Sequence, residues 1–272
     1  GKVLLYQDKF AEAASALDNV IGVYSLVSDY GSQFLRFGEN GPESVFEIQY
    51  SNQSNWYDWG CAHCSEGNYA IIMNGPRGWS GPEYAQGWSF NVPTEEFYNS
   101  FEEGDSRRDA TVLDIEAFAA ATGASYTEGY DHTGYFNNKY IPRAGESGGQ
   151  TELNYLTNFR IIRYSDVLLM AAEAYNRGGI DDGLAQEFLN QVRRRAFGGD
   201  DNDISASGSA LTDAIWEERK FELSLEGHRF FDLVRTGRAS SLIAGFVEGK
   251  HEVFPIPQQE VDISGLTQNA GY

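Results

Sequence analysis

The chain has 272 residues, of which 41% are hydrophobic and 14% aromatic, so it can bury a substantial core and is not a disordered chain. Forty Asp and Glu residues against twenty Lys and Arg residues give a formal net charge of −20. The negative electrostatic field of such a chain repels phosphate backbones and anionic lipids. We therefore do not expect nucleic acid as a partner, and the charge favours a neutral ligand. No run of about 18 apolar residues occurs, so the sequence predicts no membrane-spanning helix.

Residues 1–27 have the pattern of a helix pair. Apolar residues recur at helical spacing from Phe10 to Ile21, which predicts one helix with a continuous apolar stripe. Asp8 is the expected N-cap of this helix, and Gly22 is its expected end. The preceding "GKVLLY" has the pattern of another helix end, so the segment is interpreted as the second half of a tetratricopeptide-like helix pair.

Residues 28–157 are rich in Gly, Asn, Ser and aromatic residues and show few helical stripes. In "SVFEIQYS", Phe46 and Ile48 alternate with Glu47 and Gln49, which predicts a half-exposed strand. The rest of this region is expected to form long ordered loops, which often carry function.

From residue 158 the chain is again helical in pattern. Two apolar stripes, over residues 168–175 and 185–196, are separated by the turn "NRGGIDDG" and predict an antiparallel helix pair. A third helix is expected to start at an N-cap at Thr212, and the Pro-bounded "EVFPIPQQEVD" is expected to be extended. The sequence therefore predicts a mostly α-helical protein with long irregular loops and a few short strands, divided into residues 1–27, 28–157 and 158–272.

Five motifs in the C-terminal part occur in a fixed order and resemble one known family. They are "RIIRYSDVLLMAAEAYN", "LNQVRRRA", "EERKFELSLEGHRFFDLVRTG", "VFPIPQQEV" and "LTQNAGY". Together they resemble the C-terminal half of the SusD/RagB family, the nutrient-binding outer-membrane lipoproteins of Bacteroidetes. The opening "GKVLLYQDKFAEAASALDNVI" is similar to the tetratricopeptide helices in the middle of that family's chains.

The resemblance implies a function as well as a fold. Members of the family are anchored at the cell surface by an N-terminal lipid, bind glycans or other nutrients, and cover a SusC-like TonB-dependent transporter. We therefore expect a non-catalytic protein of polysaccharide utilisation that captures a neutral glycan and passes it to such a transporter, with no cofactor and no resident metal. We also expect the lipidated cysteine and the N-terminal half of the family's chain to be missing from this sequence.

The tryptophan-rich part of the middle region is the candidate ligand site. Trp56, Trp59, Trp79 and Trp88 lie within residues 52–90, where Leu, Ile and Val are scarce. An indole ring is a flat apolar plate that packs on the C–H face of a pyranose, while polar neighbours bind its hydroxyl groups. The alternative is that some of these rings pack the base of their own loops. The candidate ligand-binding residues are Asn55, Trp56, Tyr57, Asp58, Trp59, Arg77, Trp79 and Tyr84.

The only two cysteines lie beside these tryptophans, in "NWYDWGCAHCSEG". Cys61, His63 and Cys64 provide three of the four ligands that a structural zinc site needs, and no βαβ pattern surrounds them as in a thioredoxin-like site. In an oxidising compartment the favoured interpretation is a short Cys61–Cys64 disulfide that stiffens the aromatic turn.

Several acidic clusters raise other possibilities. Glu218 and Glu222 share a helix face, and we interpret them as structural carboxylates paired with Arg219, Arg229 and Arg235.

Neither Glu95-Glu96 nor Glu102-Glu103 can form a glycosidase dyad by itself, because adjacent residues on a helix point about 100° apart. The loop "GDDNDISASG" resembles a calcium loop but lacks its turn glycine and its final Glu. Two alternative functions are a tetratricopeptide-type protein-interaction scaffold and a hydrolase that uses Asp58 or Glu83.

Overall fold

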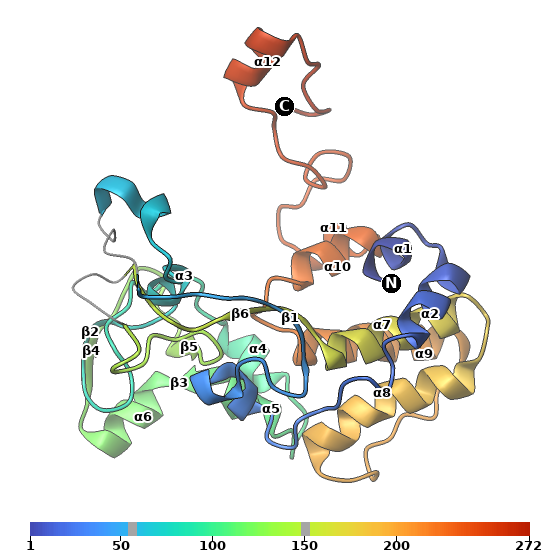
Figure 1. The fold of residues 1–272 in the computed structure, drawn as a ribbon, viewed down its shortest axis with the longest axis horizontal. Coiled ribbons are helices and arrows are strands. Elements are labelled where there is room, and N and C mark those ends of the chain that lie inside the picture. The colour runs from blue at the N-terminus through green and yellow to red at the C-terminus, as the bar shows by residue number, and fades with distance from the viewer. Residues whose placement is uncertain (54–58, 148–152) are drawn as a thin grey trace. The chain divides into compact units, whose positions relative to one another are not determined.

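The fold is mostly helical, with short strands between the helices (Figure 1). The computed structural model describes residues 1–53, 59–147 and 153–272. The described residues contain twelve α-helices, three 3₁₀ helices and six strands. The chain divides into two compact units, Gly1–Glu226 and Gly227–Tyr272, and each unit is described by itself. The predicted division into residues 1–27, 28–157 and 158–272 stays a prediction about sequence character.

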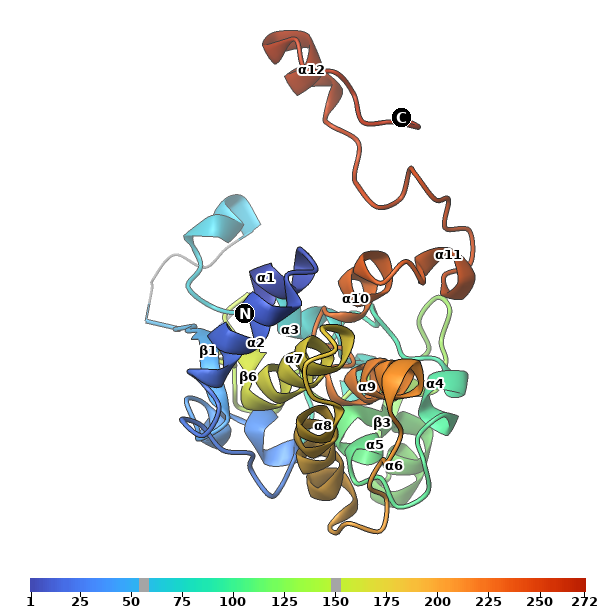
Figure 2. The same cartoon turned by 90° about the vertical axis from the view of Figure 1, so that its right-hand side faces the viewer.

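The main core of the first unit is formed by helices from the two ends of that unit. These helices are α1 (Lys2–Tyr6), α2 (Phe10–Asp18), α7 (Tyr164–Arg177), α8 (Asp182–Phe197) and α9 (Gly208–Glu222). Helix α7 lies at the centre of this group and packs against α2, α8 and α9, as the two views show (Figures 1 and 2). Nearly all of α7 is buried, which fits a helix covered on several sides rather than on one face.

The predicted apolar stripes are confirmed, but two predicted helix starts are wrong. Ala13 and Leu17 of α2 are buried in the core, as are the stripe residues of α8. Helix α2 begins after Lys9 and not after Asp8, whose φ of 54° places it in a turn. Helix α9 begins at Gly208, one turn before Thr212, whose side chain is a hydrogen-bond donor to α7 instead of a cap.

The strand predicted in "SVFEIQYS", residues 44–51, is confirmed as the shorter β1 (Ser44–Ile48), which pairs antiparallel with β6 (Phe159–Arg163). Its apolar face is the exposed one: Phe46 is 57% exposed and Ile48 40%, whereas Glu47 is only 7% exposed. Glu47 lies inside because its carboxylate accepts hydrogen bonds from the backbone N–H of Asn40 and the side chain of Asn158. A buried hydrogen-bonded carboxylate therefore decides which face of β1 points inward.

The middle region contains more regular structure than its composition predicts. Its elements are α3 (Ala70–Met73), β2 (Arg77–Ser80), α4 (Glu95–Asn99), α5 (Arg107–Thr111), β3 (Val112–Asp114), α6 (Ile115–Thr122), β4 (Ser125–Thr127) and β5 (Tyr135–Asn137). Strand β2 pairs antiparallel with β4, and β3 with β5. Side-chain caps start two of the short helices: Thr94 caps α4 and Asp114 caps α6. The short 3₁₀ helices η1 (Gly31–Phe34) and η2 (Arg36–Gly38) precede β1.

The second unit contains α10 (Arg229–Arg235), α11 (Ala239–Leu242) and α12 (Gln258–Ser264). The sequence predicts an extended tail here, and this prediction is wrong for α12. The helix starts directly after Pro257, where the fixed φ of proline suits a helix start, and ends at Gly265 with a φ of 64°.

Candidate functional site

Two tryptophans form a stacked pair at the surface of the middle region. Trp59 is the first residue of the 3₁₀ element η3 (Trp59–Cys64), and it is 54% exposed. Its ring stacks on that of Trp88, with the ring centroids 5.5 Å apart and an angle of 30° between the planes. The exposed part of the Trp59 indole therefore provides a flat apolar surface supported from behind by a second ring.

The backbone around Trp88 is fixed by α3 and by the segment that follows it. The Trp88 N–H donates to the carbonyl oxygen of Ile72, and the Gly87 N–H donates to that of Pro76, both at 2.8 Å. The two segments approach so closely that a Cβ on Gly87 would lie 2.3 Å from the Cα of Gly75. Glycine at this position is therefore required for the packing that holds Trp88 under Trp59.

Arg77 and Phe90 extend the same surface. The Arg77 Nε donates a 2.7 Å hydrogen bond to the carbonyl oxygen of Trp88, and its backbone N–H donates to the Ser89 hydroxyl at 3.1 Å. The guanidinium carbon lies 5.7 Å from the centroid of the Phe90 ring, which is 53% exposed. Both side chains are exposed, so they add a cation and a second aromatic surface beside the tryptophan pair.

A disulfide joins Cys61 and Cys64 within η3, directly after Trp59, with the Cα atoms 5.3 Å apart. The chain that follows is held to the rest of the unit: the Ser65 hydroxyl donates to the carbonyl oxygen of Leu153. The cysteines are therefore not thiolate ligands in this structure, and the disulfide closes a short turn that begins two residues after Trp59.

The structure places the sequence-predicted ligand residues that it describes in two different environments. Trp59 and Arg77 lie together at the surface. Trp79 and Tyr84 lie inside, in a cluster with Phe118, and are only 9% and 5% exposed. These two rings pack the base of the loops, with 5.9 Å between their centroids. Their burial favours the alternative role, internal packing, over direct ligand contact.

The remaining four candidates, Asn55, Trp56, Tyr57 and Asp58, lie outside the described residues. Phe90 is part of the surface, but sequence reasoning missed it. The available signal was its place two residues after Trp88 in the same Gly- and Asn-containing segment.

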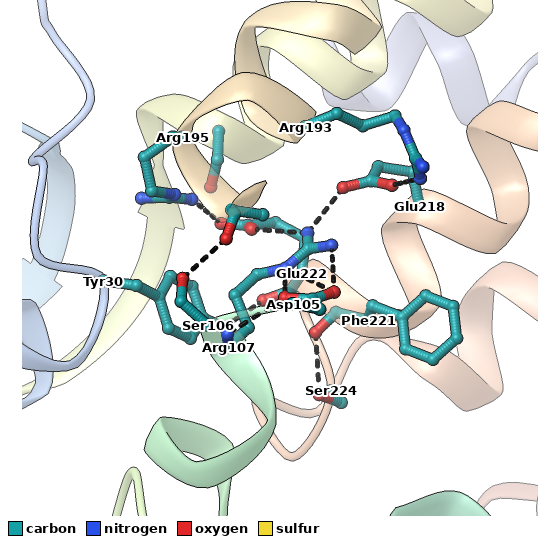
Figure 3. A network of polar contacts seen from close by, with 12 residues as sticks. Tyr30, Asp105, Ser106, Arg107, Arg193, Arg195, Glu218, Phe221, Glu222 and Ser224 are labelled. Atoms are coloured by element: carbon teal, nitrogen blue, oxygen red, sulfur yellow. Dashed lines mark hydrogen bonds and ion pairs between the residues drawn. The ribbon is translucent and has the colours of Figure 1, made fainter. Parts of the chain in front are cut away.

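A second group of polar residues, centred on Glu222 of α9, is fully buried. Arg107, Arg163 and Arg195 each form an ion pair with the Glu222 carboxylate, at 3.1, 2.9 and 2.6 Å (Figure 3 shows Arg107 and Arg195). Glu218 accepts hydrogen bonds from Arg107 and from Arg193, and is 1% exposed. Because both carboxylates are buried, a substrate cannot contact either of them, so this group of ion pairs is structural and not a catalytic site.

The predicted structural role of Glu218 and Glu222 therefore agrees with the structure, but the predicted partners do not. The arginines that pair with them come from α5, β6 and α8, far away in the sequence. Arg219 points to another partner, Asp166 of α7, at 2.7 Å. The reason is geometric: Glu218 and Glu222 lie on the side of α9 that receives arginines from α8 and from the start of α5, whereas Arg219 pairs with a residue of α7.

The charges in this group shift the protonation of its members. Burial by itself would raise the pKa of Glu222, but the positive charges of Arg195, Arg163 and Arg107 hold that pKa well below its usual value. Burial lowers the pKa of Lys139 to about 8, although Glu226, at 2.7 Å, favours the charged form.

In the loop "GDDNDISASG", which resembles a calcium loop, oxygens of Asn202 and Asp203 accept hydrogen bonds from arginine side chains of α8. Both carboxylate oxygens of Asp203 accept hydrogen bonds from Arg194, and the Asn202 carbonyl oxygen accepts one from Arg193. In the part of the chain that the structure describes, no three His, Cys, Asp or Glu side chains lie together as a metal site requires. Nor is any of the described helices both long and apolar enough to cross a membrane.

Comparison with known proteins gives consistent matches. The SusD family's sequence model matches residues 42–246. The chain is 28% identical to "SusD-like protein P2" of Formosa agariphila over 85% of its own length and 48% of the relative's, so it spans about half the length of that curated relative.

Solved structures of the same family superpose on nearly the whole chain. A "Laminarin binding SusD-like protein" is 39% identical, with a TM-score of 0.88, and the match covers all of this chain and 61% of that one. "Surface glycan-binding protein A from Bacteroides thetaiotaomicron in complex with laminarihexaose" is 33% identical, with a TM-score of 0.87, covering 98% of this chain and 61% of that chain. Since the family's model matches well over half of the sequence, the chain belongs to the SusD family.

Proposed function

We propose that this protein binds a glycan, with the exposed face of Trp59 stacked on Trp88 as the central contact. The observation that carries the proposal is this supported indole surface, 54% exposed and adjacent to a fixed arginine. A flat apolar ring packs on the C–H face of a sugar, and nearby polar groups bind its hydroxyls. Asn55, Trp56, Tyr57 and Asp58 precede Trp59 directly in the sequence, and we include them in the proposed ligand surface.

The proposed ligand is a neutral β-glucan of the laminarin type. Two similar proteins are described as binding laminarin or laminarihexaose. The net charge of −20 supports a neutral ligand, because an acidic protein repels polyanionic glycans.

The proposed biological role is glycan capture without catalysis. The full-length protein would be lipid-anchored at the outer membrane and would pass the glycan to a SusC-like TonB-dependent transporter. Of the acidic side chains considered for catalysis, Glu218 and Glu222 support a binding role, because both are buried in ion pairs.

Isothermal titration against a panel of soluble glycans that includes laminarin tests the proposal. We expect laminarin binding by the wild type and a loss of about tenfold or more in Trp59→Ala, the size of effect that exposed aromatic anchors typically have. Phe37→Ala is a matched control, because this ring is 78% exposed and lies on η2, outside the tryptophan pair.

Binding that is unchanged in Trp59→Ala would contradict the proposed site. Failure of the wild type to bind any glycan, together with specific retention of a protein partner on the helix pairs, would support the interaction-scaffold alternative. Release of reducing sugar that depends on Glu83 would instead support a hydrolase.

A further inference from the structure

A small polar cavity lies beside the paired strands β1 and β6, and residues of η1 and η2 also line it. Its charged lining consists of Glu43, Glu47, Arg160 and Arg163. All four side chains are buried, in residues that are between 1% and 7% exposed. The volume of the cavity is about 10 Å³, close to the minimum that a single water molecule requires. A ligand of this cavity is therefore no larger than one water molecule or a single ion.

Arg160 lines this cavity and has one buried N–H group without a hydrogen-bond partner. Its Nη1 donates to the carbonyl oxygen of Asn158 at 2.6 Å, and its Nη2 donates to that of Leu35 at 3.1 Å. Its Nε has no hydrogen-bond partner among the residues that the structure describes. Buried donors are nearly always paired, either with a protein group or with an ordered water molecule. The Nε of Arg160 therefore needs an acceptor beyond these side chains and carbonyl groups.

Glu47 is placed to share such an acceptor with Arg160. The two residues are opposite each other in the β1–β6 ladder, and the Arg160 Nε lies 3.7 Å from the Glu47 Oε1. This distance is too long for a direct hydrogen bond, and a water molecule can bridge polar atoms at such a separation. The Glu47 Oε1 accepts a hydrogen bond from the backbone N–H of Asn40, and a carboxylate oxygen can accept a second one. A water molecule can therefore accept from Arg160 and donate to Glu47.

The charges around the cavity favour a neutral ligand over an ion. Two carboxylates and two guanidinium groups line it, so the formal charge of the lining is zero. An anion would lie close to the carboxylates of Glu43 and Glu47, and a cation would lie close to the guanidinium groups. Either ion would be buried beside charges of its own sign, whereas water is neutral and can both donate and accept.

We infer that this cavity binds one water molecule, which accepts a hydrogen bond from the Arg160 Nε and donates one to Glu47. The water thereby joins the side chains of β1 and β6 and completes the hydrogen bonding of a buried arginine. The inference is independent of glycan binding, because it uses none of the residues that we propose as ligand contacts.

A high-resolution crystal structure of the protein, from crystals soaked in sodium bromide, tests this inference. We expect density for one water oxygen at a hydrogen-bond distance, about 2.7–3.2 Å, from the Arg160 Nε. The Arg163 Nε is the matched control, because it donates to Glu226 at 2.8 Å and should have no water beside it. Absence of density beside the Arg160 Nε would overturn the inference. Anomalous scattering from bromide at this position would also overturn it, because the ligand would then be an anion.

A nuclear Overhauser effect between the Arg160 Nε–H and water tests the same site in solution. We expect this effect at the Arg160 Nε–H and not at the Arg163 Nε–H, which is bonded to a carboxylate. The variant Arg160→Lys removes the resonance and so assigns it, and the crystallographic test depends on no variant. Equal effects at the two arginines, or none at Arg160, would contradict a bound water molecule. Glycan binding by the wild type stands or falls separately, in the titrations with laminarin.

Discussion

Several of the arginines of this acidic chain are buried in the interior, where they pair with carboxylates. Arg107 and Arg163 are no more than 2% exposed, and both contact Glu222. Burying a charge is costly unless it is paired and hydrogen-bonded, and here each guanidinium binds several carboxylates at once. Removal of one carboxylate would leave the arginines around it partly uncompensated.

The variant Glu222→Gln is therefore expected to be strongly destabilised. Breaking a buried ion pair by neutralising one partner costs about 3–5 kcal/mol, and Glu222 has three arginine partners. Chemical denaturation measures the change in the free energy of unfolding. Glu217→Gln on the same helix is the matched control: its pair with Lys220 is only partly buried, so a loss of less than about 1 kcal/mol is expected. Equal effects of the two substitutions would show that the buried pairs add no stability.

Among the elements, strand β1 shows most clearly how interior charge determines orientation. Alternation of apolar and polar residues ordinarily puts the apolar face inside. In β1 the carboxylate of Glu47 instead points inward, where it accepts a hydrogen bond from Asn158 and lies 3.7 Å from the Arg160 guanidinium. Phe46 points out because side chains alternate across a strand.

A pair of adjacent substitutions in β1 tests this orientation. Phe46→Ser should change the free energy of unfolding by less than about 0.5 kcal/mol, as is usual for exposed positions. Glu47→Ala should cost about 2 kcal/mol or more, because it removes one acceptor of the buried Asn158 amide and the negative charge 3.7 Å from the buried Arg160 guanidinium. Urea denaturation of the two variants gives both values. The reverse order would mean that the apolar face is the buried one.

For the whole molecule, the buried ion pairs link stability to pH. The pKa of Glu222 is held well below its usual value in the folded protein, so between its folded and unfolded values the unfolded chain binds more protons. The stabilisation from this carboxylate is complete above the unfolded pKa of about 4.3, and it is lost as the pH falls through the folded pKa.

We therefore expect the free energy of unfolding to decrease as the pH is lowered below about 4.3. Denaturation at several pH values between neutral and strongly acidic conditions measures the slope. The Glu222→Gln variant lacks the titrating group and should show a shallower decrease at acidic pH. If its slope equals that of the wild type, other carboxylates account for the acid sensitivity.

The sequence by itself determined the apolar stripes of the main core helices and the family resemblance. Apolar stripes such as Ala13 to Leu17 depend on local periodicity, which is present in the chain before it folds. Helix starts were harder to predict from the sequence. Asp181 caps α8, but Asp8 and Thr212 are not caps. The reason is that a hydroxyl or carboxylate can equally well form a hydrogen bond in a turn or to a residue distant in the sequence.

Only the tertiary structure decided which aromatic and charged residues face solvent. Trp59 and Trp79 have similar Gly-containing neighbourhoods in the sequence, yet one is 54% exposed and the other 9%. The arginines that pair with Glu222 come from three distant elements. Burial and ion pairing depend on segments that meet only in the folded chain, so no local sequence pattern determines them. The periodicity of a helix, by contrast, is set by the local backbone geometry and can therefore be recognised in the sequence.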